Sequence, residues 1–277
     1  MPKHTRREPE TGRAAEAPPA PRPLNLAALG EEETLFLRRL ADLSDQCAAG
    51  YIPRFSSFLN ERQQQIASAF WEQNHIENAM LFGGYGEAVR KQCGFFPVYD
   101  TPEEALFPIR ALTLKTPRDK PLSHRDFLGT LMGLGLKRES VGDIIPVEGA
   151  CTILLAESIT GFVLQELKKV GNTGVTITEG FDSALIPRQE YRELSGTVSS
   201  PRLDSLVKLC TGLAREKAAR LIQSGLVQLN YRVTESVSTA FAPGDTLTIR
   251  GYGKYTIDGI GAPTKKGRLP VSIRQYR

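Results

Sequence analysis

The chain has 277 residues, of which 40% are hydrophobic, 24% charged and 8% aromatic. Its length corresponds to about two domains, and its composition excludes the fibrous and wholly disordered classes of protein. No apolar run approaches the roughly 18 residues that a membrane helix needs. The four cysteines form no closely spaced pair and the three histidines lie far apart, so the sequence predicts a cytoplasmic chain without a disulfide framework or a metal site.

Charge is distributed unevenly along the chain, although the net charge is only +4. Residues 200–277 carry 13 Lys and Arg against 5 Asp and Glu, a net charge of +8, whereas residues 1–199 have a net charge of −4. A strongly basic C-terminal quarter on a mildly acidic body indicates a localised site for a polyanion. The alternative is a solvated basic surface that serves only solubility.

Residues 1–30 contain many prolines and alanines with charges of both signs. Such a segment cannot bury enough apolar surface to fold, and we expect a disordered leader that is neither a signal peptide nor a transit peptide. Apolar residues at helical spacing begin at Glu31 and continue, after a break with a glycine and a proline, from Phe55 to Trp71. The pattern predicts two helices in an N-terminal subdomain over residues 31–100.

The same subdomain contains the segment AMLFGGYGEAVRKQCGFFPV, which predicts a short hairpin. Its G-G-Y-G run is similar to glycine loops that cradle phosphates or clamp nucleic acids. A tight turn after a strand needs the same glycines, and we favour the turn.

Residues 101–180 alternate between strand and helix patterns. Strands are expected at FPIRALTLKT, VGDIIPV, CTILLA and GVTIT, and helices at SHRDFLGTLMGLG and Ser158–Val170. Ser123 and Asp126 have the spacing of a capping box at the start of the first helix. The order β-α-β-β-α-β predicts a ferredoxin-like (RRM-like) domain, which hosts RNA-binding modules and many enzymes and therefore names no function.

The basic quarter follows a predicted connector over residues 181–199. Residues 200–277 are expected to form a small α/β domain, which makes the whole chain α+β. Two short helices, SSPRLDSLVKLC and LAREKAARLIQSG, precede strands at LVQLNYR and TLTIRGYG, and the chain ends in a hairpin with Thr264–Arg268 at its turn.

Cations gather on these two helices and on the final turn, so that several would lie close together in space. Each Lys or Arg that neutralises a phosphate releases a condensed counterion, and arginine can also stack on unpaired bases. Solvated cations on amphipathic helices, and a solvated loop at the turn, are the alternatives. The residues expected to bind RNA are Arg202, Lys208, Arg215, Lys217, Arg220, Arg232, Lys265, Lys266 and Arg268.

Several residues at fixed spacings across about 200–250 resemble the S-four RNA-binding domain, the small module named after protein four of the small ribosomal subunit. The matching positions are Arg202-Leu203-Asp204, Ala214-Arg215, Ala218, Leu221-Ile222, Gly225, Val227, Asn230 and Pro243-Gly244-Asp245. Ala214 stands where the family commonly has a serine that can cap the second helix, and Thr211 is a possible substitute.

Over about residues 33–275 the chain resembles the YlmH-like proteins of bacteria. The resemblance includes the FGGY turn at Phe82–Tyr85, the block GLKRESVGDI at Gly135–Ile144, the S-four-like segment and the TKKGR turn. It implies a monomeric RNA-binding protein that acts on ribosomal RNA or tRNA, as a rescue or quality-control factor on large ribosomal subunits obstructed by peptidyl-tRNA. Charged residues of the GLKRESVGDI block, such as Lys137 and Asp143, are either a functional surface or a loop that holds the strand register, and we favour the second.

Catalysis is the main competing interpretation, because S-four domains also occur as appendages of RNA-modifying enzymes. A pseudouridine synthase would need a catalytic aspartate in a large domain of its own, whereas Asp204 lies inside the small module. Gly133 and Gly135 end a helix, which is the wrong context for a methyltransferase cofactor loop. The sequence shows no P-loop, nucleophile elbow, HExxH or paired-cysteine site, so we expect neither a cofactor nor enzymatic activity.

Overall fold

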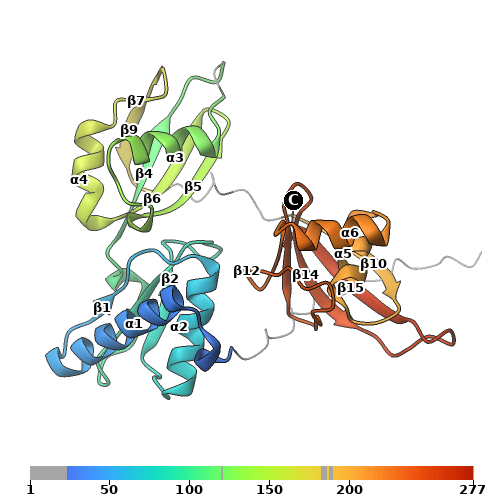
Figure 1. Ribbon diagram of the computed structural model, residues 1–277. Helices are drawn as coiled ribbons and strands as arrows, with labels where there is room; N and C mark the ends of the chain where they lie inside the picture. Colours follow the sequence, from blue (N-terminus) through green and yellow to red (C-terminus); the bar gives the residue numbers. More distant parts are fainter. Residues whose placement is uncertain (1–23, 120, 182–185, 187–189, 277) are drawn as a thin grey trace, which may run out of the picture. The chain divides into compact units, whose positions relative to one another are not determined.

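A computed structural model describes residues 24–119, 121–181, 186 and 190–276. Residues 24–181 and 190–276 belong to two compact units, drawn in Figure 1, and each is described by itself. Helices and strands are mixed in both units, which is the α+β class that the sequence predicts. None of the helices in the described ranges is long and apolar enough to cross a membrane.

The predicted leader lies outside the described residues as far as residue 23. Its last part is structured: η1 (Leu26–Ala28) is a 3-10 helix in which the Asn25 side chain accepts a hydrogen bond from the Ala27 amide. Leu26 packs against the core of the first unit. The folded chain therefore starts earlier than the sequence predicts.

The first part of the first unit packs two helices on a small antiparallel sheet. The helices are α1 (Glu31–Gly50) and α2 (Glu61–Gln73), and the strands, in sheet order, are β1 (Arg54–Phe55), β3 (Gln92–Phe95) and β2 (Ala79–Phe82). Their shared core consists of Leu40, Cys47, Leu59, Ala67, Phe70, Cys93 and Phe95. α1 ends where Tyr51 adopts a left-handed conformation, with φ of 52°.

The second helix begins six residues later than the predicted start at Phe55. Phe55 lies instead in β1, where it pairs with Gly94 of β3. Asn60 then starts α2 with a capping box, because its side chain accepts from the Gln63 amide and the Gln63 side chain accepts from the Asn60 amide, both at 2.9 Å. Strand pairing to a distant segment overrides the local helical pattern here.

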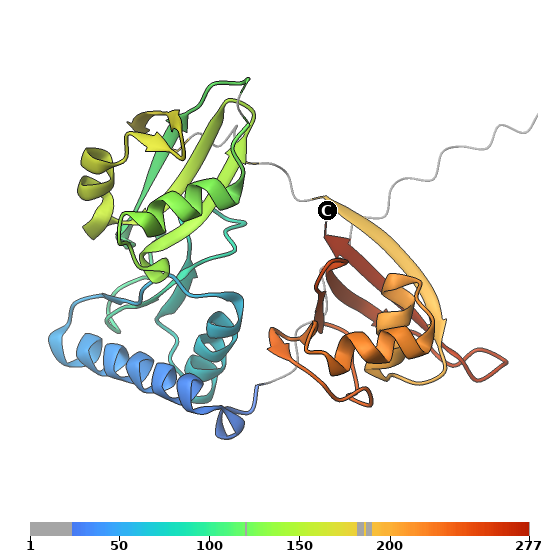
Figure 2. The same ribbon diagram turned by 45° about the horizontal axis from the view of Figure 1, so that its top comes forward.

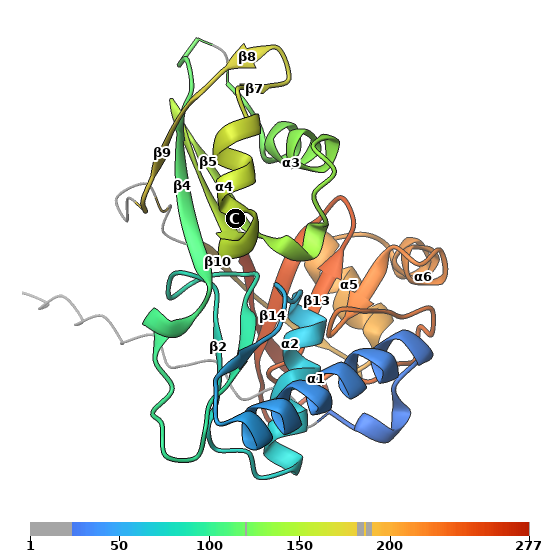
Figure 3. The ribbon, with the colours of Figure 1, turned by 90° about the vertical axis from the view of Figure 1, so that its left-hand side faces the viewer.

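The second part of the first unit is an antiparallel sheet with both helices on one face (Figure 3). The sheet order is β5-β6-β4-β9. In chain order the elements are η2 (Glu104–Leu106), β4 (Ile109–Lys115), α3 (His124–Gly133), η3 (Arg138–Ser140), β5 (Val141–Val147), β6 (Ala150–Ala156), α4 (Glu157–Glu166), β7 (Lys169–Val170), β8 (Thr173–Gly174) and β9 (Thr176–Glu179).

These elements follow the β-α-β-β-α-β order, with one added hairpin. The Ser123–Asp126 capping box is present at the start of α3. α4 stops at Glu166, four residues before the predicted end at Val170, because β7 pairs with β8 in that hairpin.

The other face of this sheet is covered near β5 and β6 by the first part of the unit. Phe58, Ile145 and Leu154 form a small buried cluster there, with Tyr85 packed against it. Gly142 has no room for a side chain, because a Cβ atom at this position would lie 2.7 Å from the Phe58 ring. The second glycine of the GLKRESVGDI block therefore permits the close approach of the two parts.

Asp143 of the same block is a buried carboxylate that fastens this contact. It accepts hydrogen bonds from the Tyr85 hydroxyl at 2.7 Å and from the amides of Val89 and Arg90 at 2.7 and 2.9 Å. Burial, and then the charge of Asp143, raise the pKa of the Tyr85 hydroxyl, which stays protonated as a donor. The FGGY turn is thus bonded to β5 through one side chain.

The second unit is a six-stranded antiparallel sheet with α5 (Leu203–Thr211) and α6 (Arg215–Gln223) against one face (Figures 1 and 2). In sheet order the strands are β10 (Tyr191–Val198), β15 (Leu269–Tyr276), β14 (Gly253–Ile260), β13 (Thr246–Ile249), β11 (Val227–Leu229) and β12 (Arg232–Val233). The unit has its own core, which includes Leu203, Ile222, Tyr255, Val271 and Ile273.

The structure corrects the predicted connector over residues 181–199. Its second half is β10, which pairs with β15 along eight residues, from Tyr191 opposite Tyr276 to Val198 opposite Leu269. The sequence did not predict this strand, because its charged residues and its glycine are not typical of a strand. The C-terminal unit therefore starts at about residue 190 and not at residue 200.

We predict that Asp143→Ala destabilises the first unit by about 2–4 kcal/mol, because it leaves three partly buried donors without their acceptor. Tyr85→Phe removes one of these bonds and should cost about 1–2 kcal/mol. Trp71, the single tryptophan of the chain, lies in α2, so its fluorescence during urea unfolding reports on this unit. Equal stability of Asp143→Ala and the wild type would contradict the role of Asp143.

Candidate nucleic-acid interface

Asp204, in the first turn of α5, holds two of the predicted RNA-binding arginines. Its side chain is 5% exposed. One carboxylate oxygen lies 3.3 Å from Nε of Arg202, and the other lies 2.8 Å from Nη2 of Arg215, at the start of α6. The guanidinium groups themselves remain open, with side chains 39% and 57% exposed. A buried anion thus positions two exposed cations.

The ionisation of Asp204 follows from two opposed effects. Burial acts to raise the pKa of this carboxyl, but the hydrogen bonds and charges of Arg215 and Arg202 outweigh it and lower the pKa below the ordinary value of 3.8. The carboxylate is therefore charged at neutral pH. With two arginines on one carboxylate, the cluster carries a net positive charge.

The other cations on the two helices differ in whether they form an ion pair. Lys208 lies on α5 one turn after Asp204, and Lys217 lies on α6 after Arg215; both are exposed and have no ion-pair partner within the described ranges. Arg220 differs, because it pairs with Glu216 one turn earlier on α6. Both of those side chains are exposed, so the pair contributes little to stability but reduces the positive charge there.

The start of α6 has no side-chain cap. Ala214 is its N-cap residue, and no side chain bonds to the first amides of the helix. Thr211 does not replace the serine of the S-four pattern: its hydroxyl donates to the Val207 carbonyl of α5 and accepts from the Leu213 amide. Asp204 therefore fixes Arg215 without help from a capping hydroxyl.

The final turn joins β14 to β15 and projects beyond the sheet (Figure 2). Gly267 adopts φ of 70°, and the Thr264 amide donates to the Arg268 carbonyl. Arg268 donates from Nε and Nη2 to the hydroxyl and carbonyl oxygens of Thr197, at 2.8 and 2.6 Å. Arg268 thus braces the hairpin against the end of β10, whereas Lys265 and Lys266 are exposed at the turn.

Arg232 is separated from this hairpin. It lies on β12 at one edge of the sheet, and β10, which holds the base of the hairpin, lies at the other edge. The predicted cations therefore fall into three places: the α5–α6 patch (Arg202, Lys208, Arg215, Lys217 and Arg220), the hairpin turn (Lys265, Lys266 and Arg268) and the β12 edge (Arg232).

Comparisons with known proteins place the chain in a family. A family model described as "Putative RNA-binding domain in YlmH" matches residues 102–181. A protein of Bacillus subtilis (strain 168) named "Ribosome-associated protein quality control protein P2" is 34% identical over 250 residues, which cover 89% of this chain and 96% of that protein. The chain belongs to the YlmH family.

A solved structure has the same fold over part of the chain. It is titled "Cell division protein ylmH from Streptococcus pneumoniae" and matches with a TM-score of 0.50 at 19% identity, over 55% of this chain and 93% of that one. The likeness concerns the fold alone. The resemblance to YlmH-like proteins that the sequence motifs carry is thereby confirmed.

The family model covers the central sheet, which raises the question of which of its surfaces can meet RNA. RRM modules stack bases on the open face of such a sheet. In this YlmH-family chain that face is covered near β6, where Leu154 is 1% exposed beneath Phe58 and Tyr85. Base stacking on this part of the face is therefore blocked.

A cluster of aromatic and cationic side chains on the C-terminal sheet is absent from the sequence-based site. Arg274 and Tyr276 alternate with the core residue Ile273 and so lie on the face opposite α5 and α6. Lys254 Nζ lies 5.0 Å from the centroid of the Tyr276 ring, and the guanidinium carbon Cζ of Arg274 lies 5.4 Å from the centroid of the Tyr191 ring. The period-2 alternation in the last strand is the signal that could have found them.

Two residues of the S-four pattern prove to be structural. Asp245 is completely buried, and Asn230 donates to one of its carboxylate oxygens at 2.9 Å. The Ala242 amide donates to the other oxygen at 2.7 Å, and the Asn230 side chain accepts from the Thr246 amide. These bonds join the β11–β12 turn, where Asn230 has φ of 49°, to the Pro243-Gly244-Asp245 turn.

No three His, Cys, Asp or Glu side chains gather around one point in the described part of the chain. All four cysteines are free thiols. Burial raises the pKa of Cys93, Cys151 and Cys210 to about 12, which leaves them protonated and unreactive at neutral pH.

We predict that Asp204→Asn weakens RNA binding by about three- to tenfold, equal to about 0.6–1.4 kcal/mol, because Arg202 and Arg215 lose their common anchor. Charge alone predicts the opposite sign, since the substitution removes a negative charge next to the RNA. Fluorescence anisotropy with labelled ribosomal RNA measures the change. Tighter binding of the variant would show that Asp204 does not position the arginines.

The stability of the C-terminal unit should also depend on Asp204 through pH. Because the folded pKa lies below 3.8, the carboxylate's stabilisation is fully present above that value and is lost as the pH falls through the folded pKa. Thermal unfolding followed by circular dichroism should therefore show a wild-type advantage over Asp204→Asn at pH 7 that shrinks below pH 4. A constant difference across this range would contradict the assignment.

Proposed function

We propose that the chain is a ribosome-associated RNA-binding protein whose C-terminal unit is an S-four-type domain that binds ribosomal RNA or tRNA. The observation that carries the proposal is the α5–α6 patch, in which Asp204 presents two exposed guanidinium groups beside Lys208 and Lys217. Such a group of exposed cations suits a nucleic-acid backbone, where each contact to a phosphate releases a counterion. The family and its ribosome-associated relative support the same function.

The relative's name also guides the finer proposal. Because that protein is named for ribosome-associated quality control, we propose that this chain binds large ribosomal subunits during rescue of stalled translation, as a monomer in the cytoplasm. The catalytic alternative gains no support from Asp204. Its side chain is only 5% exposed, and its two oxygens bond to Arg202 and Arg215, so these contacts account for it as a positioning group for the two arginines.

Sedimentation tests the ribosomal part of the proposal. We expect the full chain to sediment with isolated large subunits and not with small subunits in a density gradient. A variant with Arg215→Ala and Lys217→Ala should remain at the top of the gradient, whereas Arg250→Ala, which removes an exposed cation outside the patch, should sediment like the wild type. Equal sedimentation of all three would refute a role for the patch.

The salt dependence of RNA binding tests the patch more directly. Arg215→Ala and Lys217→Ala should each lower the slope of log K against log salt by about 0.7–0.9, the value for one phosphate contact. The melting temperature of Lys217→Ala should stay near that of the wild type, since exposed substitutions typically change stability by no more than about 0.5 kcal/mol. Arg215→Ala should lower it, because the buried Asp204 carboxylate loses one of its two arginines. An unchanged slope would show that these cations do not touch phosphate.

The hairpin turn is proposed as a second contact to the same RNA. Lys265→Ala with Lys266→Ala should weaken binding to large subunits while leaving short RNA hairpins bound nearly as before, because the second contact is effectively intramolecular only on an extended RNA. Arg268→Ala should in addition loosen the hairpin, since it removes the bonds to Thr197. Unchanged affinity of the double variant for subunits would reduce the turn to a solvated loop.

A further inference from the structure

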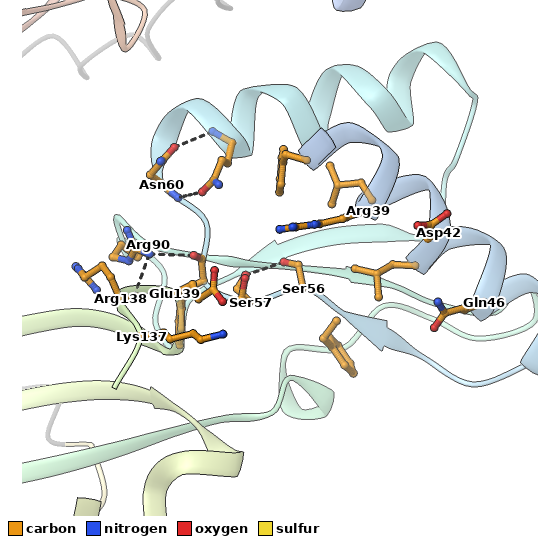
Figure 4. Close-up of a pocket in the computed structure, with 16 residues that line it drawn as sticks. Arg39, Asp42, Gln46, Ser56, Ser57, Asn60, Arg90, Lys137, Arg138 and Glu139 are labelled. Carbon is orange, nitrogen blue, oxygen red and sulfur yellow. Dashed lines mark hydrogen bonds between the residues drawn. The ribbon is translucent and has the colours of Figure 1, made fainter. Parts of the chain in front are cut away.

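A pocket of about 990 Å³ lies in the first unit, between α1, the β1 segment and the η3 turn (Figure 4). Its size is in the upper part of the range of pockets that hold small molecules and cofactors. The pocket is where the GLKRESVGDI block meets the N-terminal helix.

One wall of the pocket is a face of α1. Phe36, Leu40 and Leu43 line it at helical spacing, together with the polar residues Arg39 and Gln46. Leu40 is buried in the core, whereas Phe36 is partly exposed. This wall therefore combines an open aromatic ring with a cation.

The opposite wall is the η3 turn, which belongs to the second part of the first unit. Lys137, Arg138 and Glu139 line the pocket there. Figure 4 shows Lys137 projecting into the pocket from this wall and Arg39 projecting into it from α1. Both side chains are exposed and, within the residues that the structure describes, have no hydrogen-bond or ion-pair partner.

Two further arginines make the pocket wall rigid and keep it positive. Arg90 donates to the carbonyls of Val141 and Phe58 at 3.0 and 2.9 Å, and Arg138 donates to the carbonyls of Val141 and Gly142. Burial and the neighbouring Arg90 lower the pKa of Arg138 to about 10, so both are cations at neutral pH. Four cations thus line the pocket against two carboxylates, Asp42 and Glu139.

We propose that this pocket binds a single unpaired nucleotide of RNA, with the base against Phe36 and Phe55 and the phosphate at Arg39 and Lys137. Aromatic rings stack on bases of any sequence. Lysine and arginine side chains attract a phosphate and neutralise its charge. The amides of Gln46, Asn60 and Gln63 line the same pocket and can bond to base edges. The inference rests on the proposed RNA-binding function and adds a contact in the other unit.

A peptide fits this pocket less well than a nucleotide. An extended peptide would gain affinity by pairing with the edge strand β1, but β1 has only two residues, Arg54 and Phe55. The Cys93 amide already bonds to the Ser56 hydroxyl beyond the strand. The charge of the pocket, four cations against two carboxylates, favours a phosphorylated ligand.

The test uses the full chain with charge-reversal variants and neighbouring controls. Arg39→Glu and Lys137→Glu act on the pocket. Arg38→Glu changes the next residue of α1, and Lys169→Glu changes an exposed lysine of the same central domain; neither residue lines the pocket. The probes are a single-stranded RNA carrying 4-thiouridine, adenosine monophosphate and inorganic phosphate, and Trp71 fluorescence checks that each variant is folded.

We expect Arg39→Glu and Lys137→Glu each to weaken binding of the single-stranded RNA about tenfold, and the two controls to change it less than about twofold. Photocrosslinks to the wild type should map to the peptides that contain Phe36 or Phe55. Binding of adenosine monophosphate but not of the RNA would assign the pocket to a free nucleotide and overturn the RNA proposal. Binding of inorganic phosphate alone would mean a plain anion site and overturn it as well.

The remaining outcomes separate this inference from the proposed function. If the control variants weaken RNA binding as much as the pocket variants do, the effect comes from the overall charge of the protein. That result would overturn the proposal that the pocket binds RNA. If Arg215→Ala weakens RNA binding while Arg39→Glu does not, and no crosslink maps to Phe36 or Phe55, the pocket is refuted and the function stands. If neither substitution changes RNA binding, the proposed function itself fails.

Discussion

The buried carboxylate of Asp143 is the interaction on which the first unit depends. It bonds the FGGY turn to β5, and in doing so it brings Phe58 against Gly142 and closes one face of the central sheet. The same contact places the Arg90 side chain under the η3 turn, where it bonds to carbonyls of both parts. The GLKRESVGDI block therefore joins the two parts of the first unit, and the walls of the pocket come from both parts.

Asp204 shows how a second buried carboxylate serves a different purpose. Asp143 is satisfied by a hydroxyl and two main-chain amides, so its contacts are internal to the unit. Asp204 is satisfied partly by guanidinium groups whose remaining donors face solvent. An arginine fixed in this way loses less conformational entropy when it meets a phosphate than a freely rotating one does. The first arrangement stabilises a fold, and the second prepares a surface for binding.

Local signals were sufficient where the structure is local. The Ser123–Asp126 box starts α3 as predicted, and the TKKGR segment forms a turn between two strands, because a few neighbouring residues determine both features. β10 and β1 were missed because each forms only by pairing with a strand far along the chain. The cations were chosen by charge and helical spacing, which cannot show that Arg268 bonds to Thr197 or that Arg220 pairs with Glu216. The pocket in the first unit draws on four separate segments, and no single stretch of sequence shows it.

The pairing of β10 with β15 sets the moment during synthesis at which the C-terminal unit can fold. β10 is the first strand of the unit to be translated, and its partner is the last. Bringing the two strands together closes a long loop, which costs conformational entropy. The hydrogen bonds and contacts that offset this cost form only when both strands are present. Until Leu269–Tyr276 have left the ribosome, β10 has no neighbour in the sheet, and Arg268 has not yet braced the hairpin against Thr197. A nascent chain can therefore add β10 to the sheet and brace the hairpin turn only after β15 has been synthesised, however early the helices α5 and α6 form.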